Sequence, residues 1–208
     1  MARWYLVRHG ETDWNAQQRI QGHTDVPLNE TGRAEAARTG ARLANIPFAA
    51  VYASDLVRTQ ETARIILAQR LETDTAPVLA RSALRELAYG IFEGKTWTEI
   101  RDLEPSLRDR PRDRYLDWAP EGGETFRALI DRLSGFAREL EERHGHDDVL
   151  VVSHGGSLRA LAVALLGLPY ETFPRLRGLA PASISIITHE PGIQALTAWN
   201  DMGHLLCE

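Results

Sequence analysis

Two short motifs in this chain place a histidine and a glycine directly after an apolar run. The first is Arg8–Gly10, which follows Trp4–Val7, and the second is His154–Gly156, which follows Val149–Ser153. Arginine presents a planar fork of N–H donors that matches phosphate oxygens. A neutral imidazole can act as a nucleophile, and glycine lets a ligand come close to the backbone. Together the two motifs predict a phosphate bound against a nucleophilic histidine.

A third junction of the same kind lies between these motifs. The segment Ser54–Ala63 has the sequence S-D-L-V-R-T-Q-E-T-A and carries Arg58 at the start of a predicted helix. Simpler explanations exist for each feature taken alone. A His-Gly pair after a strand is in most cases only a turn, and Arg58 is close enough in sequence to pair with Glu61 or Asp55. Both interpretations stay open at this point.

The elements that must position these motifs alternate along the chain. Apolar runs predict strands at Trp4–Val7, Ala50–Ala53, Val149–Ser153, Ser183–Thr188 and Ile193–Trp199. Helical patterns fall at Glu30–Ala44, Leu56–Arg70, Thr98–Leu103, Glu124–His144 and Ser157–Leu166. This alternation predicts an α/β three-layer sandwich, with helices on both faces of a mostly parallel sheet. The turn Glu190–Gly192 joins the last two strands, so they are expected to form an antiparallel edge hairpin.

Composition limits the class of protein. The chain has 208 residues with 43% hydrophobic and 25% charged residues, which fits one globular domain of residues 1–208. Its formal net charge of −5 gives no basic footprint for nucleic acid, so positive charge must be concentrated locally to hold a phosphate.

Targeting and redox features are few. The N-terminus lacks a signal-peptide pattern, and the most apolar stretch, Leu158–Leu168, is too short to cross a bilayer. We therefore expect a cytoplasmic protein without membrane contact. The single cysteine, Cys207, is expected to be a free surface thiol because no second cysteine can pair with it within the chain.

One segment departs from the alternating pattern. Residues 104–121 are dense in charge and contain three prolines, and they form part of an expected small cap excursion around residues 87–123. One interpretation is a solvated connection whose acids and arginines pair with one another. The other is a cap that covers a substrate pocket and brings to its mouth one or more of four side chains, Arg108, Arg112, Tyr115 and Trp118.

The ordered set of motifs resembles the histidine phosphatase superfamily, in the phosphoglycerate mutase-like branch. The resemblance covers nearly the whole chain, and within the family the chain resembles small broad-specificity or α-ribazole-type phosphatases. It is carried by L-V-R-H-G-E-T-D-W-N, G-H-T-D-V-P-L-N-E-T-G, S-D-L-V-R-T-Q-E-T-A, L-R-E-L-A-Y-G-I-F-E-G, P-E-G-G-E-T, V-V-S-H-G-G-S-L-R-A-L and W-N-D-M-G-H-L.

The resemblance implies a role for five residues. His9 matches the nucleophile that becomes phosphohistidine, and Arg8 and Arg58 match a pair of guanidiniums that clamp the phosphoryl group. His154 matches the second histidine, which stabilises charge in the transition state. Glu86 matches the proton donor for the leaving oxygen. His9 must then be neutral, which adjacent guanidiniums favour, and Glu86 must carry a proton when it acts.

Secondary substrate contacts are expected at four further positions, Asn15, Gln21, Gly22 and Gly155. Asn15 and the backbone near Gln21 and Gly22 match phosphate contacts in the family, although Asn15 is equally well placed to cap a turn. The N–H groups at Gly155 and Gly156 open a predicted helix, where an anion is favoured.

No metal or organic cofactor is expected. The five histidines outside the two motifs show no metal-ligand spacing, and we interpret them as structural or solvated; they are His23, His144, His146, His189 and His204. The expected partner is a small phosphorylated metabolite, and the sequence leaves open whether the chain is a monomer or a homodimer.

Three functions fit these expectations to different degrees. The first is a phosphatase that hydrolyses a small phosphomonoester, and the second is a cofactor-dependent phosphoglycerate mutase. The mutases resemble one another in reading H-G-N-S where this chain has H-G-G-S, and they carry a longer insertion with paired arginines. The third, a binding protein without catalysis, fits least because all the catalytic positions are intact. The substrate candidates from the family are α-ribazole phosphate, phosphoserine, phosphoglycerates, sugar phosphates and nucleotide fragments.

Overall fold

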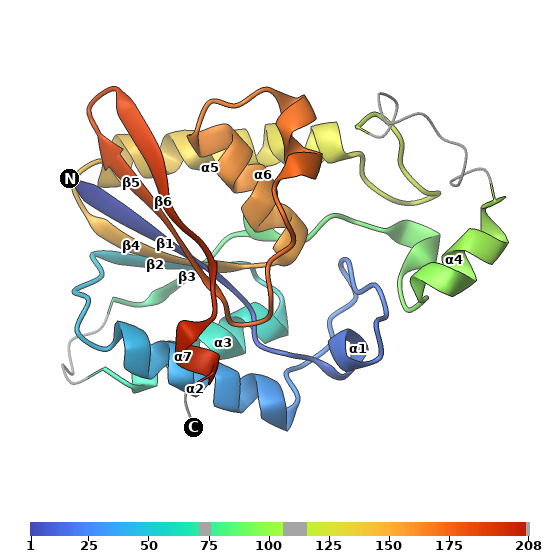
Figure 1. Cartoon of the computed structure of the whole chain (residues 1–208), viewed down its shortest axis with the longest axis horizontal. Helices are drawn as coiled ribbons and strands as arrows, with labels where there is room; N and C mark the ends of the chain where they lie inside the picture. The colour runs from blue at the N-terminus through green and yellow to red at the C-terminus, as the bar shows by residue number, and fades with distance from the viewer. Residues whose placement is uncertain (71–75, 106–115, 207–208) are drawn as a thin grey trace.

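A computed structural model describes residues 1–70, 76–105 and 116–206, which fold around a single six-stranded sheet (Figure 1). The strand order across the sheet is β3-β2-β4-β1-β5-β6. The strands are β1 (Ala2–Arg8), β2 (Ala50–Ala53), β3 (Val78–Ala80), β4 (Asp148–Ser153), β5 (Ile184–Glu190) and β6 (Ile193–Asp201).

The register of β1 and β4 decides where the two histidine motifs leave the sheet. These strands are parallel neighbours, and Arg8 lies opposite Ser153. The residues that follow, His9 and His154, therefore leave at the same edge. On the other side of β1, β5 pairs antiparallel, and β6 pairs antiparallel with β5. The predicted α/β sheet with an antiparallel edge hairpin is confirmed.

Helices cover both faces of the sheet (Figure 1). The helices α2 (Glu30–Leu43), α3 (Val57–Ala68) and α7 (Gly203–Leu206) lie on one face, and α5 (Phe126–His144) and α6 (Gly155–Leu165) lie on the other. Alternate residues of β1 serve the two layers. Trp4 and Leu6 are buried among residues of α5 and α6, whereas Tyr5 and Val7 are buried among residues of α2 and α3. Among the described residues, no helix has the length and apolar character that crossing a bilayer requires.

Several elements differ from the sequence-based prediction, including the four-residue helices Asp13–Ala16 and Gly203–Leu206, which it does not contain. The strand β3 was not predicted, because it has only three residues, none of them fully buried, at the edge of the sheet. Helix α6 begins at Gly155, two residues before the predicted start. Glycine is a poor helix former, so the pattern placed both glycines outside the helix. The fold instead uses His154, with an extended backbone, as the N-cap.

The expected cap region is described in part. It contains a 3₁₀ turn at Gly90–Phe92 and the helix α4 (Trp97–Leu103), which projects away from the sheet in Figure 1. A small apolar cluster of Ile20, Phe92 and Ile100 lies beneath it, with Trp118 packed against Phe92.

Several residues of the sequence-based hypotheses lie outside the described part of the chain. They are Arg108, Arg112 and Tyr115 of the expected cap, and Cys207.

Candidate active site

The two histidine motifs meet where β1 and β4 end, on the side of the sheet that faces α1 (Asp13–Ala16) (Figure 1). The backbone N–H of His9 donates to the carbonyl of Ser153, the last residue of β4, at 2.9 Å. The ring centroids of His9 and His154 are 5.2 Å apart with an interplanar angle of 63°. Both rings are almost fully buried. The fold therefore brings together two histidines that the sequence separates widely.

His9 has the tautomer that a nucleophile needs. Its Nδ1 lies 2.7 Å from the carbonyl oxygen of Gly10. Because a carbonyl can only accept, Nδ1 carries the proton and the lone pair is on Nε2. Within the described part of the chain, Nε2 has no hydrogen-bond partner. Burial lowers the pKa of His9 well below 6.5, and the charges of Arg58 and Arg8 lower it further. The imidazole is therefore neutral at physiological pH.

His154 has the opposite tautomer. Its Nδ1 accepts a hydrogen bond from Arg58 Nε at 3.2 Å, so its proton is on Nε2. That Nε2–H group is buried and has no partner among the described residues. Burial lowers the pKa of His154 well below 6.5, and Arg58 adds to the effect. His154 therefore presents a neutral N–H group that can donate a hydrogen bond to a phosphoryl oxygen.

The two arginines supply the positive charge. Arg58 is buried in the first turn of α3, and its Nη1 and Nη2 donate to the carbonyls of Thr24 at 2.9 Å and Gly22 at 2.8 Å. Burial lowers the pKa of Arg58 to about 10, so it stays protonated at neutral pH. Arg8 donates through Nη1 to the carbonyl of Leu179, and its buried Nε has no partner among the described residues. An unpaired guanidinium N–H in a buried site is a donor ready for an anion.

Glu86 reaches the same region from the segment that follows β3. Its carboxylate accepts from the N–H groups of Gly156 at 2.9 Å and Ser157 at 3.0 Å, in the first turn of α6. A Cβ atom at position 156 would lie 2.5 Å from Glu86 Oε1, so only glycine leaves room for this arrangement. The sequence predicts an anion at the start of α6. At the N–H of Gly156, the carboxylate of Glu86 is that anion. The contact of the Gly155 N–H with a substrate oxygen stays a prediction.

The structure shows the surroundings of Asn15 and Gln21, two of the residues that are expected to make secondary contacts with the substrate. Asn15 Oδ1 accepts from the backbone N–H of Thr12 at 3.2 Å, which makes Asn15 part of a capping box for α1. This supports the capping interpretation and leaves the Asn15 amide NH₂ outside the box. Gln21 is buried, and its Oε1 has no partner in the described structure. The contacts of Asn15, Gln21 and Gly22 with a phosphate stay predictions.

Glu93 is a residue that sequence reasoning missed. Its carboxylate accepts from the backbone N–H groups of His23 and Thr24, both at 2.9 Å. A Cβ atom at Gly22 would lie 2.0 Å from Glu93 Oε1, and Gly22 has a positive φ of 55°. Glu93 thus shapes the turn whose carbonyls hold Arg58. The motif F-E-G contained Glu93, but nothing local to it indicates a target seventy residues earlier.

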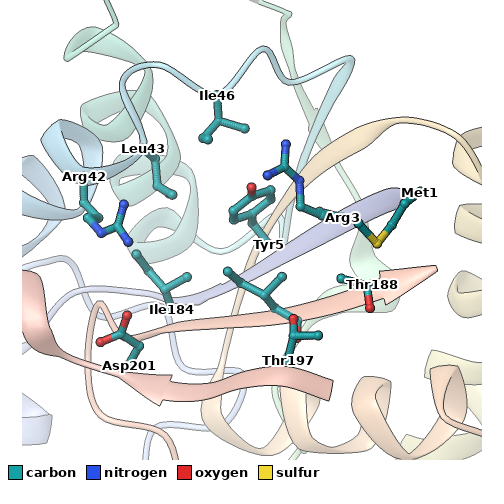
Figure 2. A pocket seen from close by; sticks show the side chains of 11 residues that line it. Met1, Arg3, Tyr5, Arg42, Leu43, Ile46, Ile184, Thr188, Thr197 and Asp201 are labelled. Atoms are coloured by element: carbon teal, nitrogen blue, oxygen red, sulfur yellow. The ribbon is translucent and has the colours of Figure 1, made fainter. Parts of the chain in front are cut away.

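A second concave region lies elsewhere, and Figure 2 shows it. This groove, which we call the β6 groove, has a volume of about 420 Å³. It is lined by Met1, Arg3, Tyr5, Arg42, Leu43, Ile46, Ile184, Ile186, Thr188, Thr197 and Asp201. Arg3 is already paired with Asp148. None of the predicted site residues lines the groove, and none of its polar atoms is among those left buried and unpartnered in the described structure.

Metal-ligating side chains do not gather anywhere in residues 1–70, 76–105 and 116–206. In these ranges, no group of three or more His, Cys, Asp or Glu side chains is arranged to hold an ion.

Comparisons with known proteins show which family the whole chain resembles. The family model of the histidine phosphatase superfamily (branch 1) matches residues 4–202. A relative from Escherichia coli O1:K1, named "Probable phosphoglycerate mutase GpmB", is 34% identical over 99% of this chain and 95% of its own length.

Two solved structures are similar over nearly their whole length. The mycobacterial glucosyl-3-phosphoglycerate phosphatase with VO3 has a TM-score of 0.85 and 31% identity, covering 95% of this chain and 98% of the other. The α-ribazole phosphatase from Shigella flexneri has a TM-score of 0.84 and 28% identity, covering 96% of both chains. The chain belongs to the histidine phosphatase superfamily.

Proposed function

We propose that this member of the histidine phosphatase superfamily hydrolyses a small phosphomonoester through a phosphohistidine on His9, without a metal ion. The observation that carries the proposal is the pair of opposite tautomers at the two strand ends. A buried, neutral His9 has its Nε2 lone pair available, and beside it lie the unpartnered N–H groups of His154 and Arg8. A nucleophile next to unsatisfied donors is the arrangement that phosphoryl transfer requires.

In the first step, the lone pair of His9 Nε2 forms a bond to phosphorus while the bond from phosphorus to the ester oxygen breaks. The proton of the Glu86 carboxyl group moves to that oxygen, and the alcohol leaves. Arg8, Arg58 and the Nε2–H of His154 hold the equatorial oxygens, where negative charge is spread in the transition state.

In the second step, a water oxygen bonds to phosphorus as the bond from phosphorus to His9 Nε2 breaks. Glu86, now a carboxylate, takes a proton from the water. Inorganic phosphate leaves, and His9 returns to its neutral form. Glu86 then carries a proton again, as the first step requires, and the N–H groups of Gly156 and Ser157 hold its carboxyl group in place.

A phosphoglycerate mutase is the second candidate, and the name of the E. coli relative favours it. In a mutase, a second substrate oxygen takes the phosphoryl group back from His9. Two features favour hydrolysis instead. The two solved structures compared above are phosphatases by name, and this chain has Gly156 where the resemblance to the mutases implies an asparagine.

The test uses the purified protein with a panel of phosphomonoesters and with 3-phosphoglycerate. We expect phosphate release from at least one ester, an acid-labile phosphate on His9 after rapid quenching, and unchanged rates after treatment with a chelator. With 3-phosphoglycerate, the expected products are glycerate and phosphate or none, even when 2,3-bisphosphoglycerate is added. Formation of 2-phosphoglycerate faster than phosphate release would instead identify a mutase.

A further inference from the structure

The backbone of the segment that carries Glu86 is held by hydrogen bonds from side chains elsewhere in the fold. The carbonyl oxygens of four successive residues, 83 to 86, each accept a hydrogen bond from a side chain outside the segment. Side-chain donors to four consecutive carbonyls are unusual, because carbonyls in irregular segments are in most cases satisfied by backbone or water. The four residues that donate them are Arg132, Ser153, Ser157 and His23.

Arg132 contacts more of these carbonyl oxygens than the other three side chains do. Its Nη1 donates to the carbonyls of Ala83 at 2.6 Å and Arg85 at 3.0 Å, and its Nη2 lies 3.4 Å from the carbonyl of Glu86. The donors come from one rigid, planar guanidinium, so they fix the relative positions of the carbonyls that they bind. A charged donor also makes stronger hydrogen bonds than a neutral one.

The guanidinium is itself held in place. Arg132 lies on α5, and it pairs with Glu124 through two contacts, Nε to Oε1 at 3.1 Å and Nη2 to Oε2 at 2.8 Å. The two side chains are only 24% and 18% exposed. Glu124 is in turn tied to the segment after Glu86, because its backbone N–H donates to the carbonyl of Ala88 at 2.8 Å.

The Glu86 segment is thus fixed from two sides. Its carboxylate rests on the N–H groups of Gly156 and Ser157 in α6, and its backbone rests on Arg132 in α5. General acid catalysis needs the donor oxygen within about 2.6–3.2 Å of the leaving oxygen. A shift of about 1 Å in a reacting group is enough to lower a rate by two orders of magnitude.

We propose that Arg132 is a positioning residue for proton donation: it holds the backbone of residues 83–86 so that Glu86 reaches the leaving oxygen. Arg132 does not touch the substrate in this scheme. The proposal rests on the proposed function, in which Glu86 is the proton donor.

The experiment compares Arg132→Gln with the native protein on two substrates. For an alkyl phosphate, whose leaving oxygen needs a proton, we expect kcat to fall about 10- to 100-fold. For an aryl phosphate with an acidic phenol, we expect a fall of less than about threefold, with KM unchanged for both, because the nucleophile and the clamp are untouched. Equal falls on the two substrates, or no fall on either, would overturn the proposal.

The matched control is Arg127→Gln. Arg127 lies on the same helix and pairs with Asp117, but both side chains are largely exposed and neither touches the Glu86 segment in the described structure. We expect native rates on both substrates. If Arg132→Gln fails to fold in a thermal unfolding assay, Arg132→Lys replaces it, since lysine keeps the charge but loses the fork. A folded Arg132→Lys protein with native rates on the alkyl phosphate would also overturn the proposal.

A double-variant cycle separates this inference from the assignment of Glu86. If Arg132 acts through Glu86, then Arg132→Gln has no further effect on the alkyl phosphate in a Glu86→Gln background. Additive losses would show that Arg132 acts by another route. If Glu86→Gln alone shows no dependence on the leaving group, the proton-donor assignment fails instead, whatever Arg132 does.

Discussion

At the ends of β1 and β4, two buried histidines each precede a glycine, and each is held through its Nδ1 atom. The partner of Nδ1 differs: at His9 it is the carbonyl oxygen of Gly10, which accepts, and at His154 it is Arg58 Nε, which donates. The proton is therefore on Nδ1 in His9 and on Nε2 in His154. Two buried histidines that share a His-Gly pair at a strand end therefore have opposite tautomers.

The difference shows that the hydrogen-bond partner of Nδ1 decides whether Nε2 carries a proton or a lone pair. Burial lowers the pKa of both histidines, so neither ring is a cation at neutral pH. A neutral ring with a free Nε2 lone pair can attack phosphorus, and a neutral ring with Nε2–H can only donate. The charge in the site comes instead from Arg8 and Arg58.

The largest expected effect comes from removing the nucleophile. We expect His9→Ala to lower kcat by about 10⁴-fold or more, because no other lone pair replaces Nε2. Phosphate release on the best substrate measures the loss, and thermal unfolding checks that the variant folds. Retention of more than about a hundredth of the native rate would show that the two histidines have been assigned the wrong roles.

A smaller effect is expected at the other strand end. His154→Ala removes one donor to the phosphoryl oxygens, and we expect kcat to fall about 10²- to 10³-fold. The protein should still form phosphohistidine on His9 with an activated aryl phosphate, although slowly. Rapid-quench labelling tests this, and failure of His154→Ala to form any phosphohistidine, with activity kept in His9→Ala, would reverse the comparison.

Arg58→Lys tests the contact that gives His154 its tautomer. Lysine keeps the charge but cannot hold Nδ1 of His154 and the carbonyls of Gly22 and Thr24 together. We expect a loss of about 10- to 100-fold in kcat/KM and a mixture of His154 tautomers in ¹⁵N NMR spectra. Arg33→Lys, which alters an exposed arginine of α2 paired with Glu61, is the control and should change neither. An unchanged His154 tautomer would mean that Arg58 does not set it.

The smallest effect concerns stability against pH, where the two histidines should behave alike. Both have a folded-state pKa below the unfolded value of 6.5. As pH falls through 6.5, the unfolded chain binds protons that the folded protein does not, so stability decreases, by at most about 1.4 kcal/mol per pH unit for each histidine. Well above pH 6.5 this contribution is fully present and constant.

Denaturant unfolding from pH 7 to pH 5 measures that slope. The double variant His9→Asn with His154→Gln cannot bind these protons in either state, so its unfolding free energy should fall less steeply with decreasing pH, by at most about 2.7 kcal/mol per pH unit. Equal slopes for the two proteins would contradict the lowered pKa values.

The sequence by itself was enough to predict five of the six strands and the edge at which His9 and His154 leave the sheet. Apolar runs ending in His9 and His154 and a helical pattern after Ser54 are local features, and parallel strands bring their carboxyl ends to one side. The ordered motifs were enough to name the family and to select Arg8, Arg58, Glu86 and the two histidines. The antiparallel hairpin also followed from a local signal, the turn at Glu190–Gly192.

Only the tertiary structure decided how these groups are held. Arg58 reaches His154 across 96 positions, and Glu86 reaches Gly156 across 70. No periodicity or spacing within one element encodes such contacts, because a hydrogen-bond partner is chosen by where the fold brings two segments together. Such partners decide the tautomers of the two histidines and the position of the Glu86 carboxylate. They also decide which backbone groups Glu93 and Arg132 bind.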